Sequence, residues 1–115
     1  MSNPLPVSAI AADIFVAPQL TPEAMAEVAR MGIRSVVNNR PDFEGGADQP
    51  TSAQIEAAAR AAGMEYRFLP VSGAYQSPEE INTFATLLGQ LPRPLLAFCR
   101  SGARSTNLDR QAVSA

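Results

Sequence analysis

The stretch PLLAFCRSGARSTN, Pro94 to Asn107, decides the fold and contains the only cysteine of the chain, Cys99. It opens with a continuous apolar run, which is typical of a strand buried on both faces of a sheet. Cys99 follows directly, and a turn containing Gly102 leads into a helix predicted from about Ala103. The sequence therefore predicts a strand, a tight turn and a helix, with the lone thiol where the strand ends.

The composition bounds the class of protein. The chain has 115 residues, of which 46% are hydrophobic and 17% charged, with a formal net charge of −2. This suits one folded domain spanning residues 1–115 and gives no electrostatic reason to expect nucleic acid as a partner. No apolar run approaches the roughly 20 residues of a membrane span, and the start of the chain lacks signal-peptide features. We therefore expect a cytoplasmic protein with no membrane partner.

Two residue counts narrow the chemistry. A single cysteine excludes an internal disulfide and a zinc site built on several cysteines. The absence of histidine excludes Ser-His-Asp and Cys-His mechanisms and histidine-based metal sites. We therefore expect no metal and no cofactor, and any nucleophile must be activated by groups other than imidazole.

Strand-like and helix-like segments alternate along the chain. Helix-starting residues occur at Thr21, Thr51 and Ser77, the last two in the capping-box pattern. This alternation predicts an α/β fold, a three-layer domain with a central, mostly parallel four-stranded sheet. The predicted strands are residues 14–17, 33–39, 65–71 and 94–98.

Apolar residues in these segments identify a candidate core. By the two-residue period of a strand, Tyr66 and Phe68 are expected on one buried face. In the last helix, Leu108 and Val113 are expected to pack on the sheet.

Sites in parallel sheets lie beyond the carboxyl ends of the strands. Three predicted loops reach that edge, at residues 39–50, 72–76 and 99–104. The candidate pocket residues on the first two loops are Arg40, Ser72 and Tyr75.

The loop after Cys99 predicts an anion cradle. Backbone N–H groups of such a turn converge, and the start of a helix adds partial positive charge. The Arg104 guanidinium can grip an oxyanion with two hydrogen bonds. The same field should lower the pKa of Cys99 and make it the catalytic nucleophile. The residues expected to form this oxyanion-binding loop are Arg100, Ser101, Gly102, Ala103 and Ser105.

Cys99 could be a nucleophile or a structural residue. We expect the Ser105 hydroxyl to donate a hydrogen bond to the sulfur of Cys99. The alternative is a structural thiol packed in the core, since free cysteine is often buried. The flanking arginine, serine and glycine residues favour the nucleophile.

The quoted residues also resemble known families. CRSGARS, Cys99 to Ser105, resembles the active-site loop of rhodaneses, which are sulfurtransferases, and is close to the Cys-x5-Arg loop of protein-tyrosine and dual-specificity phosphatases. Together, NNRPDFE, YRFLPVSG and FCRSGARSTNL resemble the phosphatase-like domain family of the beta-lactamase-hydrolase-like protein, from about Pro6 to Leu108. The resemblance implies the cysteine-phosphatase fold, phosphatase or sulfur-transfer activity, and a functional link to a metallo-beta-lactamase-type dioxygenase.

The chain departs from the phosphatase pattern in three ways. Arg104 stands five positions after Cys99, whereas phosphatases have arginine at the sixth, which here is Ser105. Phe98 replaces the usual histidine before the cysteine, and no aspartate follows Val71, where dual-specificity phosphatases usually carry a general acid.

The missing aspartate bears on the choice of reaction. Proton donation to the leaving group contributes roughly 10²–10⁴-fold in rate, whereas sulfur transfer expels sulfite or a thiolate without it. The sequence therefore narrowly favours a rhodanese-type sulfurtransferase with a persulfide on Cys99.

Two alternatives stay open. The first is a phosphomonoester hydrolase with a cysteinyl-phosphate intermediate and Asp42 as the general acid, although Asp42 also suits a solvated turn. In that loop Arg40 would bind the substrate anion or pair with Asp42. The second is an anion-binding module that has lost its chemistry. In each case the expected partner is a small anion, a sulfane sulfur donor or a phosphoester.

Overall fold

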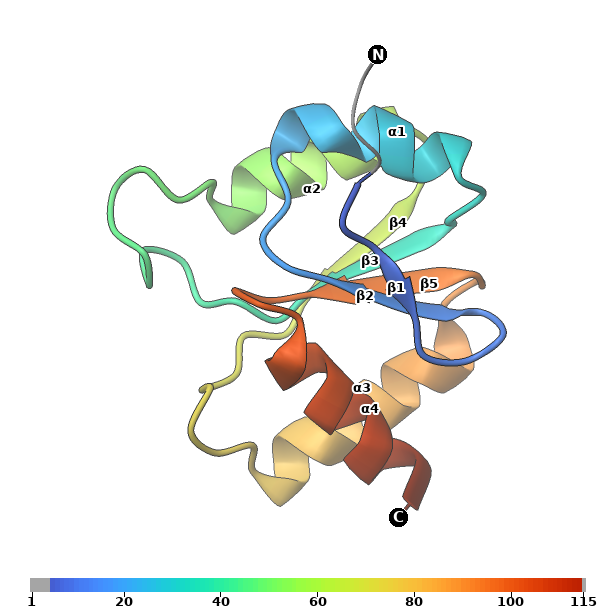
Figure 1. Cartoon of the computed structure of the whole chain (residues 1–115), viewed down its shortest axis with the longest axis vertical. Coiled ribbons are helices and arrows are strands. Elements are labelled where there is room, and N and C mark those ends of the chain that lie inside the picture. The colour runs from blue at the N-terminus through green and yellow to red at the C-terminus, as the bar shows by residue number, and fades with distance from the viewer. Residues whose placement is uncertain (1–4, 115) are drawn as a thin grey trace.

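A five-stranded sheet lies between two pairs of helices in the computed structural model, which describes residues 5–114 (Figure 1). The strand order is β1-β2-β5-β3-β4, and every pair is parallel except β1 with β2. The elements in chain order are β1 (Ser8–Ala9), β2 (Ile14–Ala17), η1 (Pro22–Ala24), α1 (Met25–Arg30), β3 (Ser35–Asn38), α2 (Ser52–Ala61), β4 (Glu65–Phe68), α3 (Pro78–Gln90), β5 (Leu95–Phe98) and α4 (Ala103–Ser114).

The predicted α/β fold with a mostly parallel sheet is confirmed. The sheet has five strands, one more than the four that the sequence predicts. All four predicted strands are present. The additional strand, β1, has two residues with exposed side chains, Ser8 and Ala9. A segment this short shows no hydrophobic alternation, so only its antiparallel pairing with β2 reveals it.

Strand β5 is the centre of the sheet and carries its core. It pairs with β2 on one side and β3 on the other, and all its residues are buried. Leu95 and Ala97 belong to the core cluster under α3 and α4, whereas Leu96 and Phe98 belong to the cluster under α1 and α2. The apolar run of the sequence therefore reflects a strand with helices on both faces of the sheet (Figure 1). Cys99 directly follows its last residue, Phe98.

Local sequence patterns start the helices. Thr51 and Gln54 form a reciprocal capping box at α2, and Ser77 and Glu80 form one at α3. The Thr21 hydroxyl accepts a hydrogen bond from the backbone of Ala24, but the chain makes the short 3-10 turn η1 before α1.

Two core predictions are wrong. Tyr66 is 2% exposed, whereas Phe68 is 39% exposed because it ends β4, an edge strand with one neighbour. Leu108 is fully buried, whereas Val113 is 70% exposed in the last turn of α4. Across residues 5–114, none of the helices combines the length and the apolar character needed to span a membrane.

One buried carboxyl in α4 lacks a hydrogen-bond partner. Asp109 is 8% exposed, and its Oδ1 atom is unpaired. Burial raises the pKa of Asp109, and the charge of Arg93 offsets only part of this. The folded protein therefore binds this proton more tightly than the unfolded chain does. Its stabilising contribution is present when Asp109 is protonated and is lost as the pH rises through the raised pKa.

We expect Asp109→Asn to be more stable than the parent chain at pH 7, because it removes a buried charge without changing the side-chain shape. The difference should shrink as the pH falls through the raised pKa of Asp109, where the parent becomes protonated. Urea unfolding between pH 4 and pH 8 measures this, with the exposed Glu23→Gln as the control. A difference that stays constant with pH would contradict the expectation.

Candidate active site

Three loops meet at the carboxyl edge of the sheet. The loops after β3 and β4 project beside the start of α4, which follows β5 (Figure 1). Arg104, in the first turn of α4, bonds to Glu44 on the loop after β3 and to the carbonyl oxygen of Val71 on the loop after β4. The predicted site loops are therefore brought together around Arg104.

Cys99 lies at the bottom of a ring of backbone N–H groups. It is 1% exposed, and the Gly102 amide donates a hydrogen bond to its sulfur at 3.0 Å. Burial is the largest single influence on the pKa of Cys99 and raises it. The backbone N–H groups of Ser105, Gly102, Ser101 and Arg104 together outweigh burial, so that the net pKa is lowered. Main-chain dipoles therefore stabilise the thiolate without histidine, in the direction that the sequence predicts.

Gly102 supplies a conformation that the turn requires. Its φ angle is +93°, in the left-handed region that side-chain-bearing residues rarely adopt. The turn is also tied to the segment after β2, since Cys99 N donates to Ala17 O and Gln19 N donates to Arg100 O, both at 3.3 Å. Glycine at this position therefore sets the amide that faces the sulfur.

The Ser105 hydroxyl does not donate to the sulfur, so that expectation is wrong. It donates to Oδ1 of Asn39 at 2.8 Å. The Nδ2 atom of Asn39 donates to the carbonyl oxygen of Leu69, which fixes Oδ1 as the accepting end. The Ser105 hydroxyl thus links the start of α4 to the end of β3, and only its backbone amide acts on Cys99.

The Arg104 guanidinium has one edge occupied. Its Nη1 and Nη2 atoms donate to Oε2 and Oε1 of Glu44 at 2.9 and 3.1 Å, and Nη1 also donates to Val71 O at 3.1 Å. Within residues 5–114, its Nε–H and second Nη2 hydrogen have no hydrogen-bond partner. Gly73 packs against the same guanidinium, because a Cβ atom there would lie 3.3 Å from Nη2. The Nε–Nη2 edge can therefore receive an oxyanion while Glu44 holds the other edge.

Glu44 is a central residue that sequence reasoning did not select. Its carboxylate is shared between Arg104 and the Nε atom of Arg40, the latter at 2.9 Å. The hydrogen bond from Arg104 is the main cause that lowers the pKa of Glu44, with Arg40 adding to it and burial opposing it. Glu44 is therefore an ionised clamp on the site arginine. The sequence could have pointed to Glu44, because the loop after β3 is the only loop at this edge of the sheet that contains carboxyl groups.

The loop after β3 is built around Arg40. This residue is 9% exposed, and its Nη1 atom donates to Oε1 of Gln19 at 3.2 Å. A Cβ atom at Gly45 would lie 2.7 Å from Nη2 of Arg40, so only glycine fits there without movement. Phe43 has a φ angle of +64°, a left-handed conformation that is rare for this residue type. Arg40 pairs with Glu44 rather than with Asp42.

The structure gives Asp42 a different contact from the predicted one. Its Oδ1 atom accepts the backbone N–H of Ser52 at 2.7 Å, at the start of α2. The first amides of a helix need such partners, so this contact is structural. No hydrogen bond or ion pair among the described residues joins Asp42 to Cys99 or Arg104. A role for Asp42 as general acid stays a prediction.

Of the remaining candidate pocket residues, neither Ser72 nor Tyr75 forms a hydrogen bond or ion pair with Arg104 or Glu44 among residues 5–114. Ser72 is exposed, and its hydroxyl accepts the N–H of Ala74, which shapes the loop. Tyr75 is 65% exposed. Among the predicted cradle residues, Arg100, Ser101 and Ala103 have exposed side chains. Over the described range, no three Asp, Glu, His or Cys residues form a group able to hold a metal ion.

The lowered pKa of Cys99 predicts rapid alkylation at neutral pH. The midpoint of the rate of reaction with iodoacetamide should lie below about 8.5, the value of a free cysteine. Inorganic phosphate should slow the reaction, because it fills the ring of amides. Mass spectrometry against time at several pH values measures both effects. A thiol that reacts only after addition of urea, or whose midpoint matches free cysteine, would show that Cys99 is an inert core residue.

Comparisons with known proteins identify relatives across the chain. The family model described as "Beta-lactamase hydrolase-like protein, phosphatase-like domain" matches residues 7–114. The Beta-lactamase hydrolase-like protein of Agrobacterium fabrum is 37% identical over 81 residues, which are 70% of this chain and 19% of that protein. The Xylella fastidiosa protein of the same name is 39% identical over 80 residues, which are 70% of this chain and 18% of that protein. The chain therefore spans about a fifth of the length of these curated relatives.

Solved structures share the fold. A Neisseria meningitidis protein described as a "putative phosphatase" is 31% identical, with a TM-score of 0.87 over 97% of this chain and 80% of that one. A mutant form of Tk-PTP is 19% identical, with a TM-score of 0.73 over 93% of this chain and 69% of that one. The core catalytic domain of a PP-IP phosphatase from S. cerevisiae is 17% identical, with a TM-score of 0.70 over 91% of this chain and 62% of that one. The last two show the fold alone.

These comparisons bear on the predicted fold and activity. The cysteine-phosphatase fold that the resemblance implied is confirmed. The neighbours support an enzyme of the phosphatase-like class and give no support to sulfur transfer. With the family model covering nearly all of its residues, the chain belongs to the phosphatase-like domain family of beta-lactamase hydrolase-like proteins.

Proposed function

We propose that this chain hydrolyses phosphomonoesters through a phosphoryl group carried on Cys99. The observation that carries the proposal is the cradle itself. A sulfur with a lowered pKa faces converging amides, and one donor edge of Arg104 has no partner in the part of the chain that the structure describes. A phosphoryl group presents the three oxygens that such donors recognise.

The reaction has two balanced steps. The Cys99 thiolate attacks phosphorus, so that an S–P bond forms as the bond between phosphorus and the leaving oxygen breaks. The leaving oxygen keeps that electron pair and takes its proton from solvent. Water then attacks phosphorus, the S–P bond breaks, the thiolate returns, and the proton of water passes to phosphate or solvent. The amides and Arg104 stabilise the charge on the transferring oxygens in both steps.

This proposal differs from the sequence analysis, which narrowly favours sulfur transfer. That preference depended on the missing aspartate after Val71. The family description and the Neisseria meningitidis structure, 31% identical, both support a phosphatase. The functional link to a metallo-beta-lactamase-type dioxygenase and the cytoplasmic location stay predictions.

The direct test is phosphate release from p-nitrophenyl phosphate. Cys99→Ser should abolish turnover, and Arg104→Lys should reduce kcat on the order of 10²–10³-fold, the cost of losing one oriented charge-stabilising group. The exposed Arg60→Lys is the control and should keep full activity. Mass spectrometry after rapid acid quench should find one phosphoryl group on Cys99. Thiocyanate formation from thiosulfate and cyanide, with added sulfur on Cys99 and no phosphate release, would overturn the proposal.

Glu44 is expected to act as a positioning residue. Because its carboxylate holds both Nη atoms of Arg104, Glu44→Gln should leave the guanidinium less well oriented and lower kcat on the order of 10–100-fold. We expect KM to change much less than kcat. Steady-state kinetics of p-nitrophenyl phosphate hydrolysis measures this split.

The matched control for that variant is Glu56→Gln, which removes an exposed carboxylate–arginine pair on α2. It should have parental kinetics. A rise in activity of Glu44→Gln would instead show that Glu44 competes with the substrate for Arg104.

A further inference from the structure

The carboxyl groups near the site make their described contacts away from Cys99. Among the loops at the carboxyl edge of the sheet, only the loop after β3 contains carboxyl groups, those of Asp42, Glu44 and Asp48. Glu44 is held ionised by two arginines, and Asp42 accepts the N–H of Ser52. Asp48 lines a surface hollow with η1 and α2. None of the three forms a hydrogen bond or ion pair with Cys99 among the described residues, so we consider a reaction that needs no acid from the protein.

Without an acid, the rate depends on how stable the leaving anion is. A tyrosine phenol has a pKa of about 10, and the second ionisation of a phosphate group has a pKa of about 6. A phosphate group therefore leaves as a stable anion at neutral pH, whereas an alkoxide does not. The site chemistry favours a leaving group that needs no proton.

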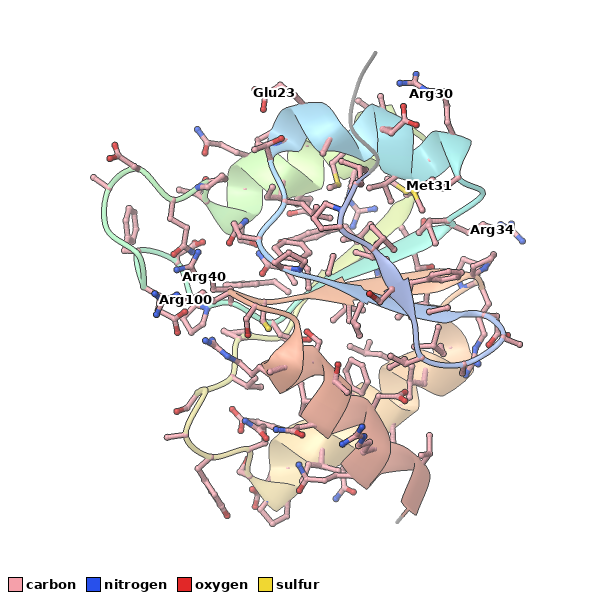
Figure 2. The ribbon with its side chains drawn as sticks, viewed as in Figure 1. Glu23, Arg30, Met31, Arg34, Arg40 and Arg100 are labelled. Atoms are coloured by element: carbon pink, nitrogen blue, oxygen red, sulfur yellow. The ribbon has the colours of Figure 1, made fainter. Side chains whose placement is uncertain are left out.

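The Arg100 side chain is a second candidate anion-binding group beside the cradle. Arg100 follows the nucleophile directly, its side chain is exposed, and no described residue forms a hydrogen bond or ion pair with its guanidinium. Gln19 links it to the other site residues, since Gln19 N donates to Arg100 O and Gln19 Oε1 accepts from Arg40. Figure 2 shows Arg40 and Arg100 next to each other, on the side where the loop after β3 projects.

The site contains a third arginine beside the two that are paired. Arg40 and Arg104 share the carboxylate of Glu44, whereas Arg100 forms no ion pair with a carboxylate of the described residues. Arg104 keeps its Nε–Nη2 edge without a hydrogen-bond partner among residues 5–114, and the exposed Arg100 guanidinium has no partner there either. The Arg100 guanidinium is therefore available to a second anionic group, beyond the transferred one.

Resting on the proposed function, we propose that the preferred substrate is a phosphoanhydride, a molecule that ends in a diphosphate. The terminal phosphorus is attacked by Cys99, so that the S–P bond forms and the bond from that phosphorus to the bridging oxygen breaks. The electron pair stays on the bridging oxygen of the inner phosphate, which leaves as an anion bound by Arg100. Water then releases the terminal phosphate, and its protons pass to the products and solvent.

The test compares three phosphoryl donors without added metal: inorganic pyrophosphate, p-nitrophenyl phosphate and glycerol 2-phosphate. We expect kcat/KM to fall in that order. Arg100→Gln should lower the ratio of kcat/KM for pyrophosphate to that for p-nitrophenyl phosphate on the order of 10–100-fold, the cost of removing a hydrogen bond to a charged group. The matched control is Arg34→Gln, an exposed arginine away from Arg40 and Arg100, which should keep the parental ratio (Figure 2).

The outcomes separate the two proposals. Cys99-dependent hydrolysis of p-nitrophenyl phosphate, with pyrophosphate no better or with an unchanged ratio in Arg100→Gln, overturns the anhydride inference and leaves the phosphatase proposal standing. Absence of phosphate release from all three donors, with no phosphoryl group on Cys99, overturns both.

Discussion

The site depends on lowering the pKa of a sulfur that is almost fully buried. Burial alone would hold Cys99 as a neutral thiol, since desolvation penalises the charged form. Backbone amides reverse this, and they do so only because the chain turns sharply at Gly102, with its left-handed φ of +93°. The central position of β5 fixes where the turn begins, and the Ser105–Asn39 hydrogen bond fixes where α4 starts relative to β3. The fold thus supplies the electrostatics that histidine supplies in other cysteine enzymes.

Arg104 connects the Cys99 loop to the other loops of the site. Its guanidinium joins the three edge loops, and Glu44 and Val71 occupy Nη1 and part of Nη2. A guanidinium offers two edges suited to bidentate binding, and an internal carboxylate on one of them directs any ligand to the other. Because Arg40 shares the charge of Glu44, the clamp does not neutralise the site.

Sequence patterns predicted those parts of the structure that local rules determine. The run of residues 94–98, the two capping boxes and the loop after Cys99 each carry their own signal, and each is found in the structure. Contacts between distant segments were the errors. The Ser105 hydroxyl finds Asn39, which is 66 positions away, and β1 exists only through its pairing with β2.

The different contacts of Asp42 and Glu44 could not be predicted for a related reason. The two carboxylates flank Phe43, whose φ of +64° redirects the chain between them. One then reaches α2 and the other reaches Arg104. Spacing in the sequence cannot predict a left-handed phenylalanine, because this residue type seldom adopts it.

The missing general acid is open to a different physical interpretation once the structure is known. The second position after Val71 is occupied by Gly73, which lies so close to Arg104 that a Cβ atom would already be 3.3 Å from Nη2. A side chain at Gly73 would crowd the Arg104 guanidinium, which we propose to bind the oxyanion. The loop thus has no carboxyl group at Gly73 and packs closely against the arginine. The loss of an acid does not by itself change the group that an enzyme transfers; it limits the enzyme to bonds whose leaving atoms are stable without a proton.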